Sequence, residues 1–168
     1  LAIRTSKSIY LLKGDVRAKA FVRAKEFRAL IEKALSETRK DDSSISILGH
    51  SRLVTNGAEE KEENNQPVTF GDVMCVHNGI VVNDAKLWKD LGTLSRETAI
   101  DTEVIAALID HYRKERSLEV SVELTMSKLE GAATIAVLCQ NDAKFCLATN
   151  TGSLYYCENS NNSLIFAS

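Results

Sequence analysis

The last part of the chain constrains the fold most. Four short apolar runs follow one another there, each bounded by Asn, Asp or Gly residues, a pattern typical of β-strands joined by short turns. They cover residues 132–139, 144–149, 154–157 and 164–167. Two segments with apolar side chains at helical spacing come before them, one starting at Asp101 as its cap or first residue and one over residues 118–129. This succession predicts an α+β fold of mainly antiparallel sheets covered by helices.

The first part of the chain predicts a hairpin, a helix and a further strand. Residues 2–4 and 8–13 have the pattern of two strands joined by a turn, and apolar residues recur at helical spacing over residues 25–37. Residues 45–48 form another apolar run. Residues 58–66 are rich in acidic and amide side chains, which predicts a solvated surface loop.

A short apolar run at residues 73–76 ends at His-Asn-Gly, residues 77–79. An Asn at a strand end offers a fixed amide donor, and the following Gly lets a backbone N–H approach a ligand closely. The pair could therefore donate two hydrogen bonds to one developing oxyanion. Taken alone, the dipeptide is also typical of a turn between strands. Beyond it, Asn83 is expected to cap a short helix over residues 84–91.

Composition excludes several classes of function. The chain has 168 residues, 44% hydrophobic and 26% charged, which fits one domain over residues 1–168. A net charge of −2 and a pI near 6.0 give no basic footprint for nucleic acid, and no run is long enough to span a membrane. The four cysteines lack metal-ligand spacing, so we expect reduced, buried thiols in a cytoplasmic protein, without cofactor or metal.

Three motifs in this order resemble the glutaminase domain of class II glutamine amidotransferases, and most of all the glucosamine-6-phosphate synthase branch. They are Gly-His-Ser-Arg-Leu-Val-Thr-Asn-Gly at residues 49–57, Val-His-Asn-Gly-Ile at 76–80 and Ile-Asp-Thr-Glu-Val at 100–104. Residues 129–133 and 164–168 also resemble strands near the end of that domain. The resemblance implies the N-terminal-nucleophile fold, an αββα sandwich of mainly antiparallel sheets flanked by helices.

The resemblance also implies a role for individual residues. Arg52 would pair bidentately with the α-carboxylate of glutamine, as suits a planar guanidinium, and Thr55 would assist at the same end of the substrate. Asp101 would hold the α-ammonium group. The side-chain amide of Asn78 and the backbone N–H of Gly79 would form the oxyanion hole for the γ-amide carbonyl.

The histidines receive structural roles, because an N-terminal amine serves as the base in this family. We expect His50 and His77 to be packed and hydrogen-bonded, and His111 to lie on the surface of a helix. Leu53 and Asn56 stand where the synthase branch has Trp and His, so the packing near the substrate differs from that branch.

The nucleophile of the family is a cysteine at the first position of the mature chain, whose thiol attacks the amide while its α-amino group relays the proton. Leu1 stands at that position here. Cys75 lacks a free α-amine, and the other cysteines lie in strand interiors, so no nucleophile is expected within these residues. Residues 1–3 resemble a strand that follows the nucleophile in the family, which implies a domain incomplete at both ends.

Three hypotheses follow from these residues. The first is the glutaminase half of an amidotransferase, with glutamine as its small-molecule substrate and an acceptor or synthase domain in the same chain or on a partner. The second is a catalytically inactive module that binds glutamine. The third is a structural domain of the same fold with no affinity for glutamine.

Overall fold

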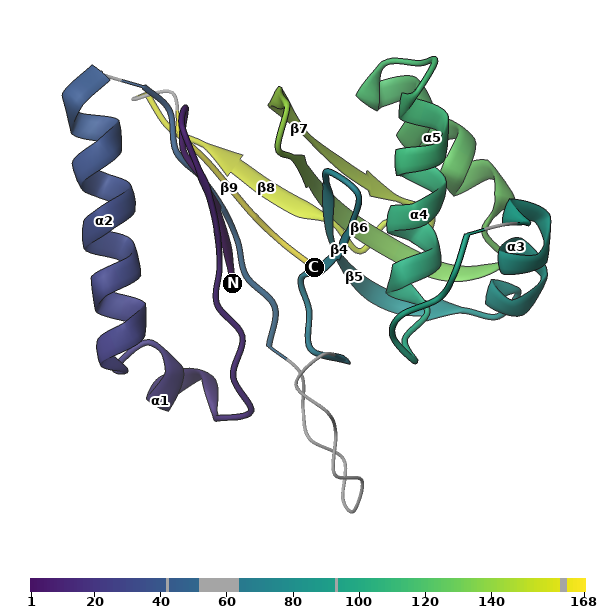
Figure 1. Cartoon of the computed structure of the whole chain (residues 1–168), viewed down its shortest axis with the longest axis horizontal. Helices are drawn as coiled ribbons and strands as arrows, with labels where there is room; N and C mark the ends of the chain where they lie inside the picture. Colours follow the sequence, from purple (N-terminus) through teal and green to yellow (C-terminus); the bar gives the residue numbers. More distant parts are fainter. Residues whose placement is uncertain (42, 52–63, 93, 161–162) are drawn as a thin grey trace.

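The chain forms four layers, in which two β-sheets lie face to face between helices (Figure 1). The computed structural model describes residues 1–41, 43–51, 64–92, 94–160 and 163–168. None of the helices in these ranges combines the length and the apolar character that a membrane crossing requires.

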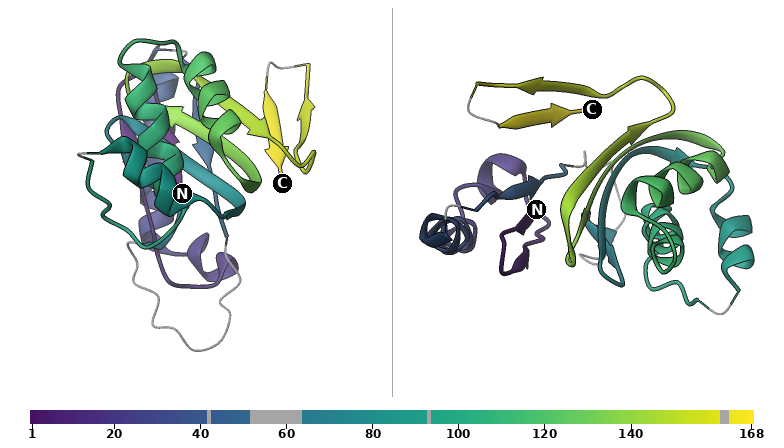
Figure 2. Two further views of the ribbon diagram at one scale, coloured as in Figure 1. Left: turned by 90° about the vertical axis from the view of Figure 1, so that its right-hand side faces the viewer. Right: turned by 90° about the horizontal axis from the view of Figure 1, so that it is seen from above.

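Two antiparallel sheets form the centre of the molecule. The first has the strand order β2-β1-β3, the second the order β4-β5-β6-β7, and a separate hairpin of β8 and β9 lies next to the first sheet (Figure 2). The strands are β1 (Ala2–Arg4), β2 (Ile9–Leu11), β3 (Ser46–Leu48), β4 (Val68–Phe70), β5 (Val73–Val81), β6 (Gly131–Cys139), β7 (Asp142–Thr149), β8 (Tyr155–Glu158) and β9 (Leu164–Ala167).

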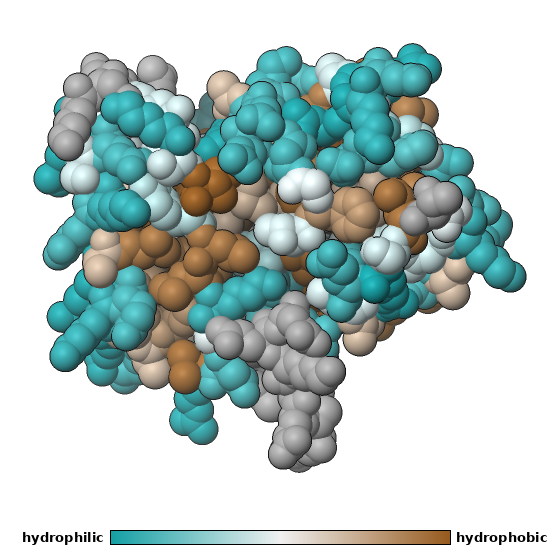
Figure 3. Space-filling view, viewed as in Figure 1, coloured by the Kyte–Doolittle hydropathy of each residue, from teal (hydrophilic) through white to brown (hydrophobic). Residues whose placement is uncertain are grey.

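Helices cover the outer face of each sheet. The first sheet is covered by α2, with the short α1 before it, and hydrophobic side chains gather on this face between α2 and the neighbouring strands (Figure 3). Helices α3, α4 and α5 pack on the second sheet (Figure 1). The helices are α1 (Ala18–Phe21), α2 (Lys25–Asp41), α3 (Asp84–Leu91), α4 (Thr102–Arg113) and α5 (Leu118–Lys128).

Strand β5 contributes to both hydrophobic cores, because successive side chains of a strand point to opposite faces. Met74 and Val76 belong to the core between the two sheets, together with Leu48 of β3. Val73 and Cys75 belong to the core between the second sheet and the helices, and neither has any exposed surface. The alternation therefore sends every second side chain of β5 toward the first sheet.

The expected α+β fold with antiparallel sheets and the αββα arrangement is confirmed, while one local prediction is wrong and two short elements were not predicted. Asn83 precedes α3 but its side chain makes no capping bond. Its amide instead donates to Lys128 O at 2.9 Å and accepts from Glu130 N at 3.1 Å, joining α3 to the start of β6. Helix α1 and strand β4 were not predicted, since each has only three or four residues and too few positions to show a period.

A buried guanidinium joins the two sheets. Arg4 of β1 is 6% exposed, and its side chain donates to the main-chain carbonyls of the turn between β6 and β7. The acceptors are Cys139, Asp142, Ala143 and Lys144, and Ser46 Oγ of β3 accepts at 3.2 Å. Carbonyl groups rather than a carboxylate thus satisfy this buried charge.

Replacing Arg4 with methionine should lower the free energy of unfolding by about 3 kcal/mol or more, because each buried carbonyl left without a donor costs about 1–3 kcal/mol. The measurement is urea unfolding followed by circular dichroism. Arg23, which is exposed, is the matched control, and Arg23→Met should stay within about 0.5 kcal/mol of the parent protein. Equal effects of the two substitutions would show that Arg4 does not join the sheets.

Candidate functional site

The site is built on β5, which continues through the His-Asn-Gly segment. The predicted end of the strand at Val76 is wrong, because β5 remains paired with β6 from Val73 to Val81. The alternative of a turn at Asn78 and Gly79 is therefore wrong, because both residues are paired within β5. Pairing over this whole length outweighs the weak strand preference of Asn and Gly.

The other edge of β5 is paired only at its beginning. Strand β4 pairs with residues Val73 to Cys75 and goes no further. In an antiparallel ladder alternate residues turn their N–H and C=O groups to opposite edges. Ala133 lies opposite Gly79 on β6. Its N–H donates to Asn150 Oδ1 and its carbonyl accepts from Asn150 N, both on the side of β6 away from β5. Gly79 therefore turns its own N–H toward the unpaired edge of β5.

Two side chains occupy this edge on either side of Gly79. The carboxamide of Gln66 accepts from His77 N at 2.6 Å and donates to His77 O at 2.9 Å. The carboxylate of Asp101 accepts from Val81 N at 2.7 Å. The Gly79 N–H lies between these positions and has no acceptor among the described residues. It is a fixed donor that is free to bind a ligand oxygen.

Only glycine fits at position 79. Its φ of 145° lies in a region that other residues rarely adopt, and a Cβ atom would come 2.0 Å from Ala132 O and 2.9 Å from His77 Nε2. A side chain at this position would therefore push β5 away from β6 and displace the free N–H.

Asn78 turns its side chain in the direction of the first sheet, since it alternates with His77 along β5. Its Nδ2 donates to Ser168 Oγ at 3.3 Å, just beyond β9. Asn78 lines two adjoining cavities, one next to β9 and one along the free edge of β5. Asn78 therefore shares the cavity along the free edge of β5 with Gly79, and the oxyanion hole formed by the two residues stays a prediction.

Asp101 immediately precedes α4 and lines the cavity along the free edge of β5. Its side chain does not cap the helix; it reaches Val81 N and lies 3.7 Å from His77 Nδ1 through its other oxygen. Burial alone would raise the pKa of Asp101, but the nearby His77 ring and the hydrogen bond from Val81 N outweigh burial and lower it. The carboxylate is therefore charged at neutral pH and about a quarter exposed, at 26%.

The three histidines occupy the environments expected of structural residues. His77 is 3% exposed, its Nε2 lies 3.3 Å from Ala132 O, and its Nδ1 lies 3.5 Å from Thr102 Oγ1. Since a carbonyl only accepts, Ala132 O pairs with the tautomer of His77 that carries its proton on Nε2. His50 is half-buried and lines the cavities, while His111 is exposed on α4 and contacts Tyr112.

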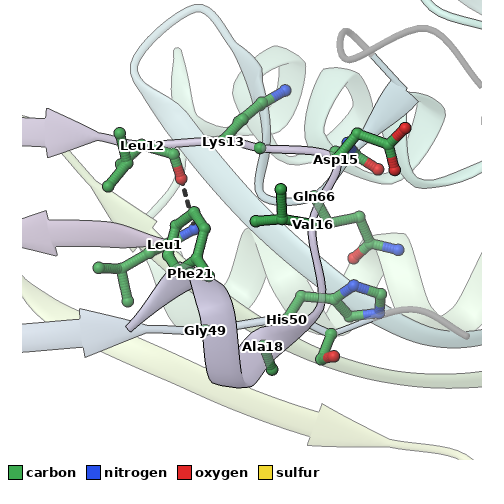
Figure 4. Close-up of a pocket in the computed structure, with 13 residues that line it drawn as sticks. Leu1, Leu12, Lys13, Asp15, Val16, Ala18, Phe21, Gly49, His50 and Gln66 are labelled. Atoms are coloured by element: carbon green, nitrogen blue, oxygen red, sulfur yellow. Dashed lines mark hydrogen bonds between the residues drawn. The ribbon is translucent and has the colours of Figure 1, made fainter. Parts of the chain in front are cut away.

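A neighbouring cavity meets the site at His50 and Gln66 (Figure 4). Its other walls come from the segment between β2 and α1 and from the residues after β3, with Phe21 closing one side (Figure 4). The segment after β3, from Gly49 to Ser51, lines this cavity and the one next to Asn78. The motif beginning at Gly49 is thus placed beside the His-Asn-Gly motif.

Part of the predicted site lies outside the described residues. The predicted site residues outside the described ranges are Arg52 and Thr55. Leu53 and Asn56, the two positions that differ from the synthase branch, also lie outside them. The structure brings together the remaining three predicted residues, Asn78, Gly79 and Asp101, along one cavity.

Sequence reasoning missed Gln66. The predicted surface loop includes residues 64–66, but these are half-buried, and Asn64 Oδ1 accepts from Ala99 N at 3.0 Å. That prediction is wrong for this end of the loop. An amide residue just before Pro67 and a strand was the available signal, but its meaning depends on the strand register.

The cysteines are all free and lie on strands of the second sheet or on β8. Cys75 and Cys139 are buried as expected, whereas Cys157 is exposed, contrary to expectation. Burial raises the pKa of both Cys75 and Cys139, the latter to about 12, so neither forms a thiolate readily at neutral pH. No cysteine is among the described residues that line the two cavities next to Asn78. Nor do three His, Cys, Asp or Glu side chains cluster as metal ligands within the described ranges.

Comparison with known proteins agrees with this geometry. Residues 50–168 match a family model described as a glutamine amidotransferase domain. Glutamine–fructose-6-phosphate aminotransferase (isomerizing) from Caulobacter vibrioides is 38% identical over 126 residues, which cover 72% of this chain and 21% of that protein. The enzyme of the same name from Vibrio vulnificus is 38% identical over 109 residues, which cover 63% and 18%. The chain thus spans about a fifth of the length of these curated relatives.

Two solved structures share the fold. Glutamine phosphoribosylpyrophosphate amidotransferase from B. subtilis, complexed with ADP and GMP, aligns with a TM-score of 0.54 and 26% identity, covering 68% of this chain and 25% of that chain. A structure described as the allosteric regulatory enzyme of purine biosynthesis aligns with a TM-score of 0.57 and 28% identity, over the same shares of the two chains.

Proposed function

The chain belongs to the family of glutamine amidotransferase domains, and from that premise we propose that it hydrolyses glutamine to glutamate and ammonia for transfer to an acceptor. One observation supports this most: the free N–H of Gly79 lies between two occupied backbone positions, beside the amide of Asn78 and in the same cavity as the Asp101 carboxylate. A site for glutamine requires two hydrogen-bond donors for the oxyanion that forms at its side-chain amide. It also requires an anion that binds its α-ammonium group.

In this proposal Asp101 binds the α-ammonium group of glutamine. The hydrogen bond from Val81 N leaves further lone pairs on its carboxylate, which can accept from the ligand. Asn78 Nδ2 leaves Ser168 and donates, with Gly79 N, to the γ-carbonyl oxygen. These donors are held in place before the reaction and stabilise the negative charge that forms when the carbonyl is attacked.

The attacking thiol would come from a segment of the parent protein outside residues 1–168. The buried state of Cys75 and Cys139 supports this proposal, as does the lack of a cysteine among the described residues lining the cavities at Asn78. The thiol sulfur would form a bond to the carbonyl carbon of the side-chain amide, and the C–N bond would break as ammonia leaves with the thiol proton. Water would then hydrolyse the γ-glutamyl thioester to glutamate and regenerate the thiol.

For the α-carboxylate we propose Arg52 as the bidentate partner and Thr55 as a further contact. Both follow Ser51 within five residues, and Ser51 lines the cavity that Asn78 shares. A guanidinium is the side chain best matched to a carboxylate in shape and charge.

The ammonia would be used by an acceptor or synthase domain in the same protein or on a partner. The relatives support this, because the matched region is about a fifth of each enzyme and the rest of their chains carries other parts. Free thiols throughout the described residues are consistent with our proposal of a cytoplasmic location.

The direct test is intact mass and N-terminal sequencing of the natural protein, combined with an assay of glutamate released from glutamine. We expect a mature N-terminal cysteine upstream of Leu1 and steady release of glutamate. A natural protein that binds glutamine without releasing glutamate would instead be an inactive binding module, and one without affinity for glutamine would be a structural domain.

A further inference from the structure

We propose that Gln66 is a positioning residue for the oxyanion hole, acting through the peptide groups of His77; this inference rests on the proposed glutaminase function. The two polar atoms of the Gln66 side chain both bond to the main chain of His77, and not to Asn78 or Gly79. It therefore acts on the site through the backbone of β5.

The register of the second sheet shows why an amide side chain stands here. Val68 pairs with Cys75 in the β4–β5 ladder, so two residues further along the ladder Gln66 is the residue opposite His77. Pro67, the residue between, has no N–H and cannot continue the ladder. The carboxamide carries one carbonyl and one amino group, so it gives His77 the acceptor and the donor that a strand partner would have supplied.

This contact fixes the direction of the Gly79 N–H. Gly79 has no side chain to hold it, and its φ of 145° is far from ordinary strand values, so its orientation depends on the peptides on either side. The peptide on one side is held by Gln66 at His77 and that on the other by Asp101 at Val81. Without Gln66, one end of this segment loses its anchor.

The same short segment also holds the loop that leads to Asp101. Asn64 Oδ1 accepts from Ala99 N at 3.0 Å, two residues before Asp101. Residues 64–66 thus link the oxyanion strand to the start of α4. The oxyanion hole and Asp101, which we expect to bind the side-chain amide and the α-ammonium group of glutamine, are therefore both held by this one segment.

The test uses the full-length natural protein and the variants Gln66→Ala and Gln66→Glu, with Gln140→Ala as matched control. Gln140 is an exposed glutamine in the turn after β6, away from these cavities. Gln66→Ala should lower kcat for glutamine hydrolysis about 10- to 100-fold with KM changed by less than about threefold, since a small displacement of a catalytic donor affects the reaction step. The control should retain the parent kcat.

The glutamate variant separates positioning from mere packing, because it has nearly the same shape. An ionised carboxylate still accepts from His77 N but cannot donate to His77 O, whereas a protonated carboxyl group can do both. The ratio of variant kcat to parent kcat should therefore rise as pH falls through the pKa of the introduced glutamate. The titratable groups that line the two cavities next to Gln66 are Lys13, Asp15, His50, His77, Asp84 and Asp101. Dividing by the parent kcat removes the part of their pH dependence that the two proteins share.

Hydrogen exchange gives a readout that does not need activity. In Gln66→Ala, peptides covering β5 should lose protection while those of α4 and α5 keep it. If the parent protein releases no glutamate, the proposed function fails, yet the exchange experiment still tests the contact. If the parent is active and Gln66→Ala keeps its kcat, the inference is overturned. Should the alanine variant not fold, a flat pH ratio for the glutamate variant would overturn it equally.

Discussion

Replacing Asn78 with alanine should lower kcat for glutamine hydrolysis by roughly 10²- to 10³-fold, with little change in KM. The amide of Asn78 donates to Ser168 Oγ in this structure, and Asn78 lines two adjoining cavities, one of which Gly79 also lines. Its donor would stabilise charge only when the tetrahedral oxyanion forms, so its loss affects the transition state more than substrate binding. Steady-state kinetics with a coupled assay for glutamate measures both constants.

The isosteric variant Asn78→Asp is the matched control for shape. It replaces the Nδ2 donor with a second acceptor oxygen, so we expect a loss of kcat at least as large as for alanine. Turnover close to that of the parent in either variant would rule Asn78 out of the oxyanion hole.

The second large effect is expected at Asp101. Asp101→Ala should raise KM for glutamine about 30-fold or more, because loss of the partner of a buried charge costs on the order of 2–5 kcal/mol. The matched variant Asp101→Asn keeps an acceptor for Val81 N but removes the charge. If the carboxylate binds an ammonium group, the asparagine variant should also bind glutamine poorly. An asparagine variant with the parent KM would assign Asp101 a purely structural role.

Asp101 also determines the pH dependence that we expect for the stability of the parent protein and for its binding of glutamine. Because the pKa of Asp101 in the folded protein lies below its ordinary value of 3.8, its contribution to stability is complete above that value. The contribution is lost as pH falls through the lowered pKa. Binding of glutamine should therefore not depend on Asp101 titration anywhere between pH 5 and pH 8.

Much of the fold was predictable because its signals are local. The strands β6, β7 and β9 are apolar runs ended by turn residues, and α4 shows its buried stripe in the spacing of Val104, Ile105, Leu108 and Ile109. The end of β5 was not predictable in this way. Its polar residues look like a turn, and only pairing with β6, more than fifty residues away in sequence, keeps them in a strand.

The residues of the candidate site also differ in whether a local sequence signal predicts them. Asn78, Gly79 and Asp101 carry motif signals that could be read from the sequence, and the structure places them along one cavity. The hydrogen bond between the Asp101 side chain and Val81 N could not be predicted, since a residue before a helix is expected to cap that helix. Gln66 had no motif signal because its function arises only when the register sets it opposite His77.

The most direct test of the proposed glutaminase site is covalent labelling of the full-length natural protein with an electrophilic analogue of glutamine, followed by peptide mass spectrometry. The account predicts a single label on an N-terminal cysteine upstream of Leu1, with protection by glutamine and loss of labelling in Asp101→Ala. A label on Cys75, Cys139, Cys146 or Cys157, or no label that glutamine protects, would contradict it.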